Sequence, residues 1–204
     1  MADVTLTYKG STIAEMSNTG SKTLKTSGKY CEGDIEVSYV KPEGVTSDEL
    51  AKKIITREGD ITELPSDITK ISKCAFYNFT NLALTSLPSG ITSVGDYAFY
   101  YCENLALTSL PEGITSIGDY TFCGCKNLSL TSLPSSVTSI ENYAFRYCTS
   151  LTTLTFKGTP TGISDSAFYR CDNLTNIYVP WAEGAVANAP WGATHATIHY
   201  NTTT

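Results

Sequence analysis

The chain has 204 residues, of which 14 are basic and 20 acidic, so its formal net charge is −6. This balance excludes a basic face for nucleic-acid phosphates, and no apolar run is long enough to span a membrane. The first residues, MADVTLTYKG, lack the charged start and the apolar stretch of a secretory signal. We therefore expect either that the chain is made in the cytoplasm or that it has already been trimmed.

Residues 1–44 predict a small β-module that ends in a hinge. VTLTYKG, STIAEM, KTLKTSGKY and GDIEVSYV alternate apolar and polar residues and are separated by Gly, Ser and Asn, as in a small antiparallel sheet. KPEG at 41–44 is the expected hinge. A unit of about forty residues is marginal as an independent fold. We therefore expect it to pack against the rest of the chain or against another subunit. In the second case the protein would self-associate through this module.

Residues 45–60 predict an amphipathic capping helix. Thr46 and Glu49 have the spacing of a capping box, and Leu50 and Ile54 belong to an apolar stripe. Gly59 stands where such a helix would end. We expect the helix to lie on the first rung of the repeats that follow.

Residues 61–182 contain a sequence motif that repeats every 23 residues. Residues 91–113 read ITSVGDYAFYYCENLALTSLPEG and 114–136 read ITSIGDYTFCGCKNLSLTSLPSS, identical at 15 of the 23 positions. Further full copies occupy 68–90, 137–159 and 160–182, and ITELPSD at 61–67 is a partial copy. A fixed period of this length with leucine in repeated slots is the mark of a leucine-rich-repeat solenoid. The predicted fold is thus an α/β solenoid of five repeats.

Each copy predicts one short helical turn and two short strands. Ala98, Phe99, Cys102 and Leu105 have the spacing of one helical face, and Asp96 stands before them as a helix cap. LALTSLP and ITSI read as short strands that would pair in parallel from copy to copy. A single copy cannot enclose a core, so stability must come from neighbouring copies.

The motif I-x-x-I-G-x-x-A-F-x-x-C-x-x-L resembles the BspA-like leucine-rich repeats of bacterial surface proteins. The resemblance implies a solenoid that binds proteins or cell surfaces. The flanking segments, TYKGSTIAEM with KTLKTSGKYCEGDIEVSYV and VPWAEGAVANAPWGATHATIHYN, resemble segments of phage or prophage tail proteins of gut Firmicutes. That second resemblance implies a virion-associated protein; the alternatives are a cell-surface adhesin exported by another route, and a structural spacer.

Residues 183–204 predict a C-terminal cap. Trp181 and Trp191 flank its start, and the alternating stretch THATIHY reads as a strand. His195 and His199 lie in or beside that stretch, where strand geometry would hold the two rings about 13 Å apart. We therefore expect no metal site, no cofactor and no catalytic residues, and we interpret the protein as a non-catalytic binding or structural protein.

The repeated cysteines predict buried thiols rather than disulfides or metal ligands. Cys102, Cys125, Cys148 and Cys171 share the slot that Phe79 fills in the first copy, and a slot that accepts phenylalanine is apolar. Cys123 falls in a different slot, occupied elsewhere by tyrosine or arginine. We expect it to be an exposed free thiol.

The chain has 13 tyrosines, and several fall on the expected outward side of the turns. Exposed tyrosine offers stiff, amphipathic contact area of the kind found in binding surfaces; the other interpretation is that the rings shield neighbouring rungs. The candidate binding surface for a protein or cell-surface ligand is Tyr77, Tyr100, Tyr101, Arg146, Tyr147 and Tyr169.

Overall fold

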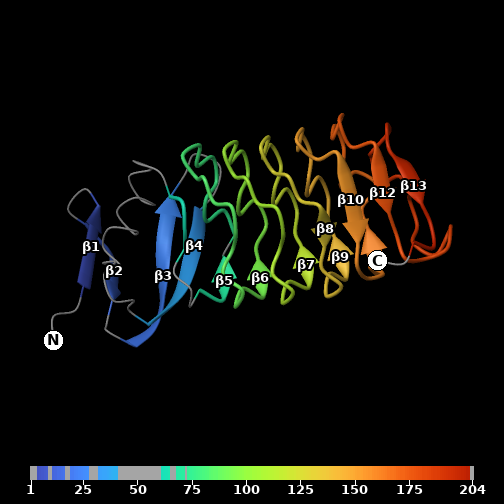
Figure 1. Cartoon of the computed structure of the whole chain (residues 1–204). Helices are drawn as coiled ribbons and strands as arrows, with labels where there is room; N and C mark the ends of the chain where they lie inside the picture. Colours follow the sequence, from blue (N-terminus) through green and yellow to red (C-terminus); the bar gives the residue numbers. More distant parts are fainter. Residues whose placement is uncertain are drawn as a thin grey trace.

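The computed structural model describes residues 4–8, 11–16, 19–27, 32–40, 61–64, 68–71 and 73–202. They form an elongated array, with residues 4–8 at one end and residues 197–199 near the other (Figure 1). The helix expected at 45–60 lies outside the described residues.

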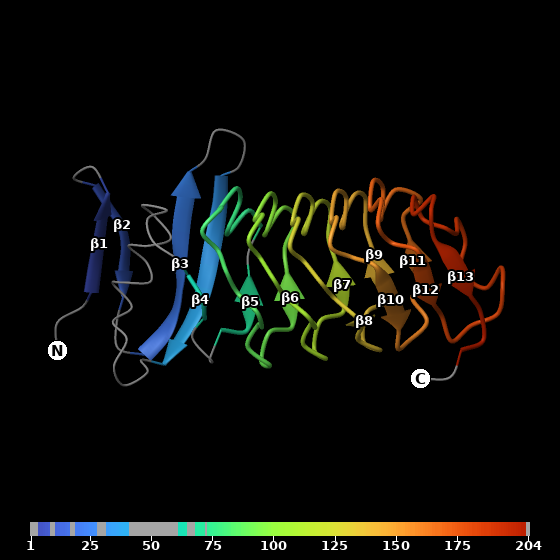
Figure 2. The same cartoon turned by 45° about the horizontal axis from the view of Figure 1, so that its top comes forward.

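Two antiparallel hairpins precede the repeats. β1 (Val4–Tyr8) pairs with β2 (Ser11–Met16), and β3 (Thr19–Ser27) pairs with β4 (Glu32–Val40). β4 lies beside the first strand of the repeats (Figure 2). The antiparallel pairing agrees with the alternation of the sequence, although the four strands form two separate ladders rather than one sheet. That residues 1–44 act as one module stays a prediction.

The repeats form a parallel β-solenoid with two columns of short strands. The ITSI segments supply β5 (Lys70–Ile71), β6 (Ser93–Val94), β7 (Ser116–Ile117), β9 (Ser139–Ile140) and β11 (Gly162–Ile163). The second column contains β8 (Ser132–Leu133), β10 (Thr153–Phe156), β12 (Asn176–Tyr178) and β13 (Thr197–His199). Every pairing within these columns is parallel. The predicted stack of parallel strands is thereby confirmed.

The strand register follows the sequence period. Ser116 pairs with Ser139 and Ile117 with Ile140, each 23 residues on. In β7 the serine is exposed and the isoleucine buried, because successive side chains of a strand point to opposite faces. Equivalent residues of neighbouring copies therefore lie directly on one another, which builds the core as columns of like side chains.

The helical turns expected between the strand columns are replaced by successive β-turns, and the described residues contain no α-helix. The amide of Phe99 donates to the carbonyl of Thr121 in the next rung at 2.9 Å, whereas the amide of Tyr100 donates within its rung to Tyr97 at 3.2 Å. Tyr97 and Tyr101 adopt φ of 56° and 54°, in the left-handed region that interrupts a helix. Every second amide of the turn segment donates a hydrogen bond to the next rung, so it is not available for the hydrogen bonds of an α-helix.

The Asp96 slot also has a different role from the predicted helix cap. A carboxylate oxygen of Asp96 accepts the amide of Asp119 at 3.2 Å, and Asp119 in turn accepts the amide of Asn142 at 3.0 Å. Gly118 makes this possible, since a Cβ there would collide with the Asp96 carboxylate. These side chains join one rung to the next.

The centre of each rung is an aromatic and thiol column. The rings of Phe99 and Phe122 stack with centroids 5.4 Å apart and an interplanar angle of 7°. The thiol of Cys125 donates to the carbonyl of Phe99 at 3.0 Å, and that of Cys148 to Phe122 at 3.1 Å. The four repeated cysteines are buried and reduced, as the shared apolar slot predicted; Cys74, in the first rung, is disulfide-bonded.

Aromatic residues cover the last rung. Trp191 is fully buried, and its carbonyl accepts the amide of Phe168 at 2.9 Å. Trp181 packs edge-on against Phe156 with centroids 5.3 Å apart. β13 lies within the segment that predicted a strand and extends the second column by one member. That 183–204 is a separate cap stays a prediction.

We predict that Phe122→Ala lowers the free energy of unfolding by about 3–5 kcal/mol, because it removes a ring that is packed between two others. Tyr169→Ala is the matched aromatic control: its side chain is 43% exposed, and we expect a loss below about 1 kcal/mol. Denaturant melts measure both, and equal losses would contradict the assignment of the core.

Candidate binding surface

One side of the turn segments carries a continuous group of tyrosines from consecutive rungs, here named the tyrosine surface. It contains the six predicted residues and three tyrosines of a neighbouring slot: Tyr77, Tyr97, Tyr100, Tyr101, Tyr120, Tyr143, Arg146, Tyr147 and Tyr169. Each member touches at least one other.

Rung spacing sets the geometry of this surface. Tyr97 and Tyr120 stack with centroids 4.8 Å apart at 11°, and Tyr77 and Tyr100 stack at 4.8 Å and 15°. This spacing is the distance between neighbouring strands, so equivalent rings fall into face-to-face contact. The faces of these rings are therefore used in packing between rungs.

The tyrosines are half-buried, except Tyr169, which is exposed. Tyr100 contacts the rings of Tyr97, Tyr101 and Tyr120 as well as Tyr77. The expectation that Tyr100 simply faces outward is therefore wrong: its ring also holds neighbouring rungs together. The shielding and binding interpretations are compatible, because a ring can pack through its face and present its edge.

The prediction made from the sequence for Cys123 is also wrong. This cysteine is only 1% exposed, although the sequence predicted an exposed thiol. Gly124 follows it, and the ring of Tyr101 lies so close over this glycine that a Cβ would be 2.9 Å from it. Burial raises the pKa of Cys123 to about 11, with a smaller opposing effect of Arg146. The thiol is thus protonated near neutral pH and unreactive.

Burial also changes the tyrosine hydroxyls. It raises the pKa of Tyr100 to about 12, helped by the nearby Cys123 and Tyr101, and it raises the pKa of Tyr97 and Tyr120. These hydroxyls stay protonated over the physiological range. They can donate hydrogen bonds to a ligand.

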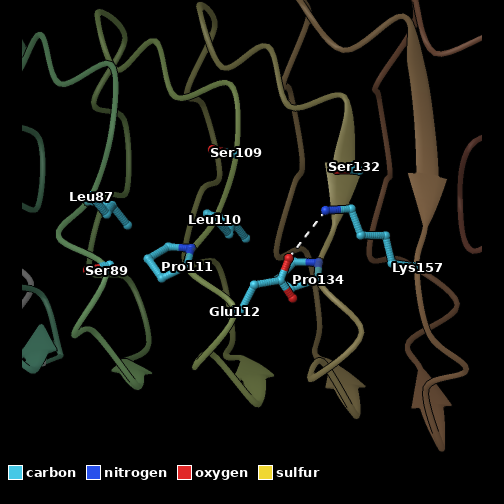
Figure 3. A pocket seen from close by; sticks show the side chains of 9 residues that line it. All are labelled: Leu87, Ser89, Ser109, Leu110, Pro111, Glu112, Ser132, Pro134 and Lys157. Atoms are coloured by element: carbon cyan, nitrogen blue, oxygen red, sulfur yellow. Dashed lines mark hydrogen bonds and ion pairs between the residues drawn. The ribbon is translucent and has the colours of Figure 1, made fainter.

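A shallow groove lies at the bend that follows the second strand column. It has a volume of about 390 Å³ and is lined by Leu87, Ser89, Ser109, Leu110, Pro111, Glu112, Ser132, Pro134 and Lys157. Figure 3 shows Lys157 pointing back along the stack toward Glu112, and their charged atoms are 3.2 Å apart. Lys157 occupies the slot that holds proline at 88, 111 and 134. Because Lys157 and Glu112 pair with each other, neither leaves a free charge in the groove. The other lining residues are leucine, proline and serine.

The described residues contain no group of three or more side chains suited to a metal ion. His199 instead stacks on Tyr178 with centroids 4.4 Å apart, and its Nε2 lies 2.9 Å from the amide oxygen of Asn176. Nor do the described residues form any helix of the length and apolarity that a membrane crossing needs.

Sequence reasoning missed two parts of these surfaces. Tyr97, Tyr120 and Tyr143 are not among the predicted surface residues, because their contacts with the neighbouring slot depend on how the turn folds. The pairing of Glu112 with Lys157 spans two rungs. A lysine in a proline slot was the available signal.

Comparisons with known proteins agree with this architecture. Residues 60–175 match the family described as "BspA type Leucine rich repeat region" in six copies. The crystal structure of a leucine-rich-repeat protein of T. pallidum is 25% identical with a TM-score of 0.53, and the match covers 71% of this chain and 70% of that one.

Two further structures share lower similarity. A leucine-rich repeat protein from Bacteroides ovatus is 24% identical (TM-score 0.41; 58% of this chain and 39% of that one). The pneumococcal vaccine antigen PcpA is 16% identical (TM-score 0.46; 71% and 42%). No curated protein matches the chain.

We predict that the protein loses thermal stability as the pH rises from about 10 to about 12. The pKa of Tyr100 is about 12 in the folded chain and 10.0 without the fold, so the unfolded chain releases this proton first and is favoured as the pH rises. Tyr100→Phe should make the decline shallower. Melting temperatures across this range, with tyrosinate absorbance of the folded protein, test it; a folded protein whose tyrosines all ionise near pH 10 would contradict it.

Proposed function

Because the chain belongs to the BspA-type leucine-rich-repeat family, we propose that it is a non-catalytic binding or structural protein, specifically a phage or prophage tail-associated component. In this proposal the solenoid presents the tyrosine surface to a protein or cell-surface ligand. Leucine-rich repeats generally serve protein interactions, and the flanking segments resemble those of tail proteins. The protein would be made in the cytoplasm and incorporated into the virion.

The observation that carries the binding function is the tyrosine surface itself. Its rings are fixed by stacking at the rung spacing, so a ligand would meet an ordered surface and little side-chain entropy would be lost on binding. Tyrosine is also enriched among the residues that dominate interface energies. A solenoid that served only as a spacer would need the ring stacking that holds its rungs together. It would not need an exposed ring such as that of Tyr169.

The alternative is a BspA-like surface adhesin of a bacterium. The family description favours it equally, since the same surface would serve recognition on a cell. The two proposals differ in location: antibodies against the protein would label phage tails in the first case and intact bacterial cells in the second. A spacer without a ligand of its own is the third candidate, and the next experiment addresses it.

We predict that Tyr101→Ser combined with Tyr169→Ser weakens binding to cells about tenfold, because two aromatic contacts are removed from one surface. Flow cytometry of the labelled protein on a panel of gut Firmicutes measures it. Tyr178→Ser is the matched control, since Tyr178 stacks on His199 in the second strand column, away from the tyrosine surface. An equal loss in the control would refute the assignment, and no binding by the unchanged protein would favour the spacer.

The N-terminal hairpins suggest a division of labour in which residues 1–44 attach the protein to a carrier or to a second copy. We predict that their deletion, with Cys74→Ser because Cys74 is disulfide-bonded, leaves a cooperatively melting solenoid and abolishes self-association. Light scattering and circular dichroism of the two chains measure this. Unchanged assembly after deletion would place the association in the repeats.

A further inference from the structure

Arg146 breaks the pattern of its column in the tyrosine surface. Equivalent positions hold Tyr77, Tyr100, Cys123 and Tyr169, so the repeat places one cation among aromatic rings. Its guanidinium carbon lies 4.6 Å from the ring centroid of Tyr147, and 5.2 Å and 5.5 Å from those of Tyr143 and Tyr169. The three rings hold the charge in place by cation–π attraction.

Within the part of the chain that the structure describes, no carboxylate forms an ion pair with this cation. Among the described residues, Lys73, Lys126, Lys157 and Arg170 each lie beside a carboxylate. The side chain of Arg146 makes one hydrogen bond to the described residues, from a terminal nitrogen to the hydroxyl oxygen of Tyr147 at 3.1 Å. In a chain with 20 acidic residues, a half-buried arginine without a carboxylate leaves its charge available to a ligand.

The guanidinium also has unused donors. Its Nε is buried and has no hydrogen-bond partner, which is costly for a charged group. Among the described residues, the second terminal nitrogen makes no hydrogen bond, and the residue as a whole is half-buried. Because the oxygen of Tyr147 accepts from Arg146, its own proton is free to be donated. The guanidinium and the adjacent hydroxyl thus supply two hydrogen-bond donors at one place on the surface.

We propose that Arg146 and the hydroxyl of Tyr147 form a subsite for the carboxylate of an acidic side chain on a protein partner. A single cation with one hydroxyl matches a monoanion, whereas phosphate groups are generally bound by several basic residues. A protein is favoured over a sugar because the guanidinium of Arg146 already lies over the rings of Tyr143, Tyr147 and Tyr169. The ring face that it covers is not available as a platform for a sugar ring. The subsite rests on the proposed binding function and names the chemistry of its partner.

The test uses the full chain with arginine side chains labelled with ¹⁵N and a blocked peptide of alternating Glu and Gly. The buried Nε–H of Arg146 is the reporter, assigned with Arg146→Lys. We expect a saturable shift of this signal with the Glu peptide and none with the matched Gln peptide. Arg146→Gln should weaken peptide binding about tenfold or more, and Tyr147→Phe, which keeps the ring, should weaken it about threefold.

Arg170→Gln is the control, because it removes the same charge from the next rung, where Arg170 lies 3.6 Å from Asp172. An equal loss in Arg170→Gln, or an equal shift with the Gln peptide, would overturn the subsite. Tighter binding of inorganic phosphate or of sialyllactose would overturn the assignment to a protein carboxylate.

The peptide experiment can contradict the subsite without contradicting the proposed function, and the reverse also holds. Peptide binding that depends on Arg146 supports the subsite even if no cell binding is found, in which case the cell-recognition proposal fails alone. Cell binding by the tyrosine surface without any peptide response would retain the proposed function and overturn the subsite. Thermal melts of each variant exclude loss of the fold as the cause.

Discussion

The hydrogen bonds between rungs in the turn segments are the constraint on which the rest of the structure depends. In each turn segment every second amide, such as that of Phe99 or that of Phe122, donates to a carbonyl of the next rung. The intervening amides close β-turns within their own rung. This alternation excludes a helix and requires left-handed residues at fixed places. It also keeps rungs at strand spacing around the whole circumference, so that side chains of one slot stack directly.

That spacing explains why the same residue types recur. Phenylalanine rings stack at the centre, thiols donate to the carbonyls of the preceding rung, and Asp96 bridges to Asp119. A polar residue is tolerated only where it finds partners: Thr121 stands in a buried alanine slot and donates to the carbonyls of Gly118 and Gly95 at 2.9 and 3.3 Å. Departures from the repeat therefore carry information, because most slots impose their residue.

Arg146 and Lys157 are two such departures, and they differ in a way that bears on function. Lys157 replaces a proline and pairs with Glu112, so its charge is satisfied by the chain. Arg146 replaces a tyrosine and is surrounded by rings without a carboxylate. The tyrosine surface thus combines a rigid stack, protonated hydroxyls and one available cation, which is a suitable arrangement for recognising an acidic group on a partner.

The sequence by itself determined the 23-residue period, the parallel stack and the burial of Cys102 and its equivalents, because a repeated apolar slot can only be filled by stacking. It also identified most of the tyrosine surface. Only the tertiary structure decided that the turns are not helical and that Cys123 is buried. Both depend on contacts between rungs, such as the amide of Tyr101 donating to the carbonyl of Cys123 at 2.7 Å. A helical spacing of apolar residues is shared by helices and by turns of this kind, and the competition for backbone amides that separates them appears only when the rungs are stacked.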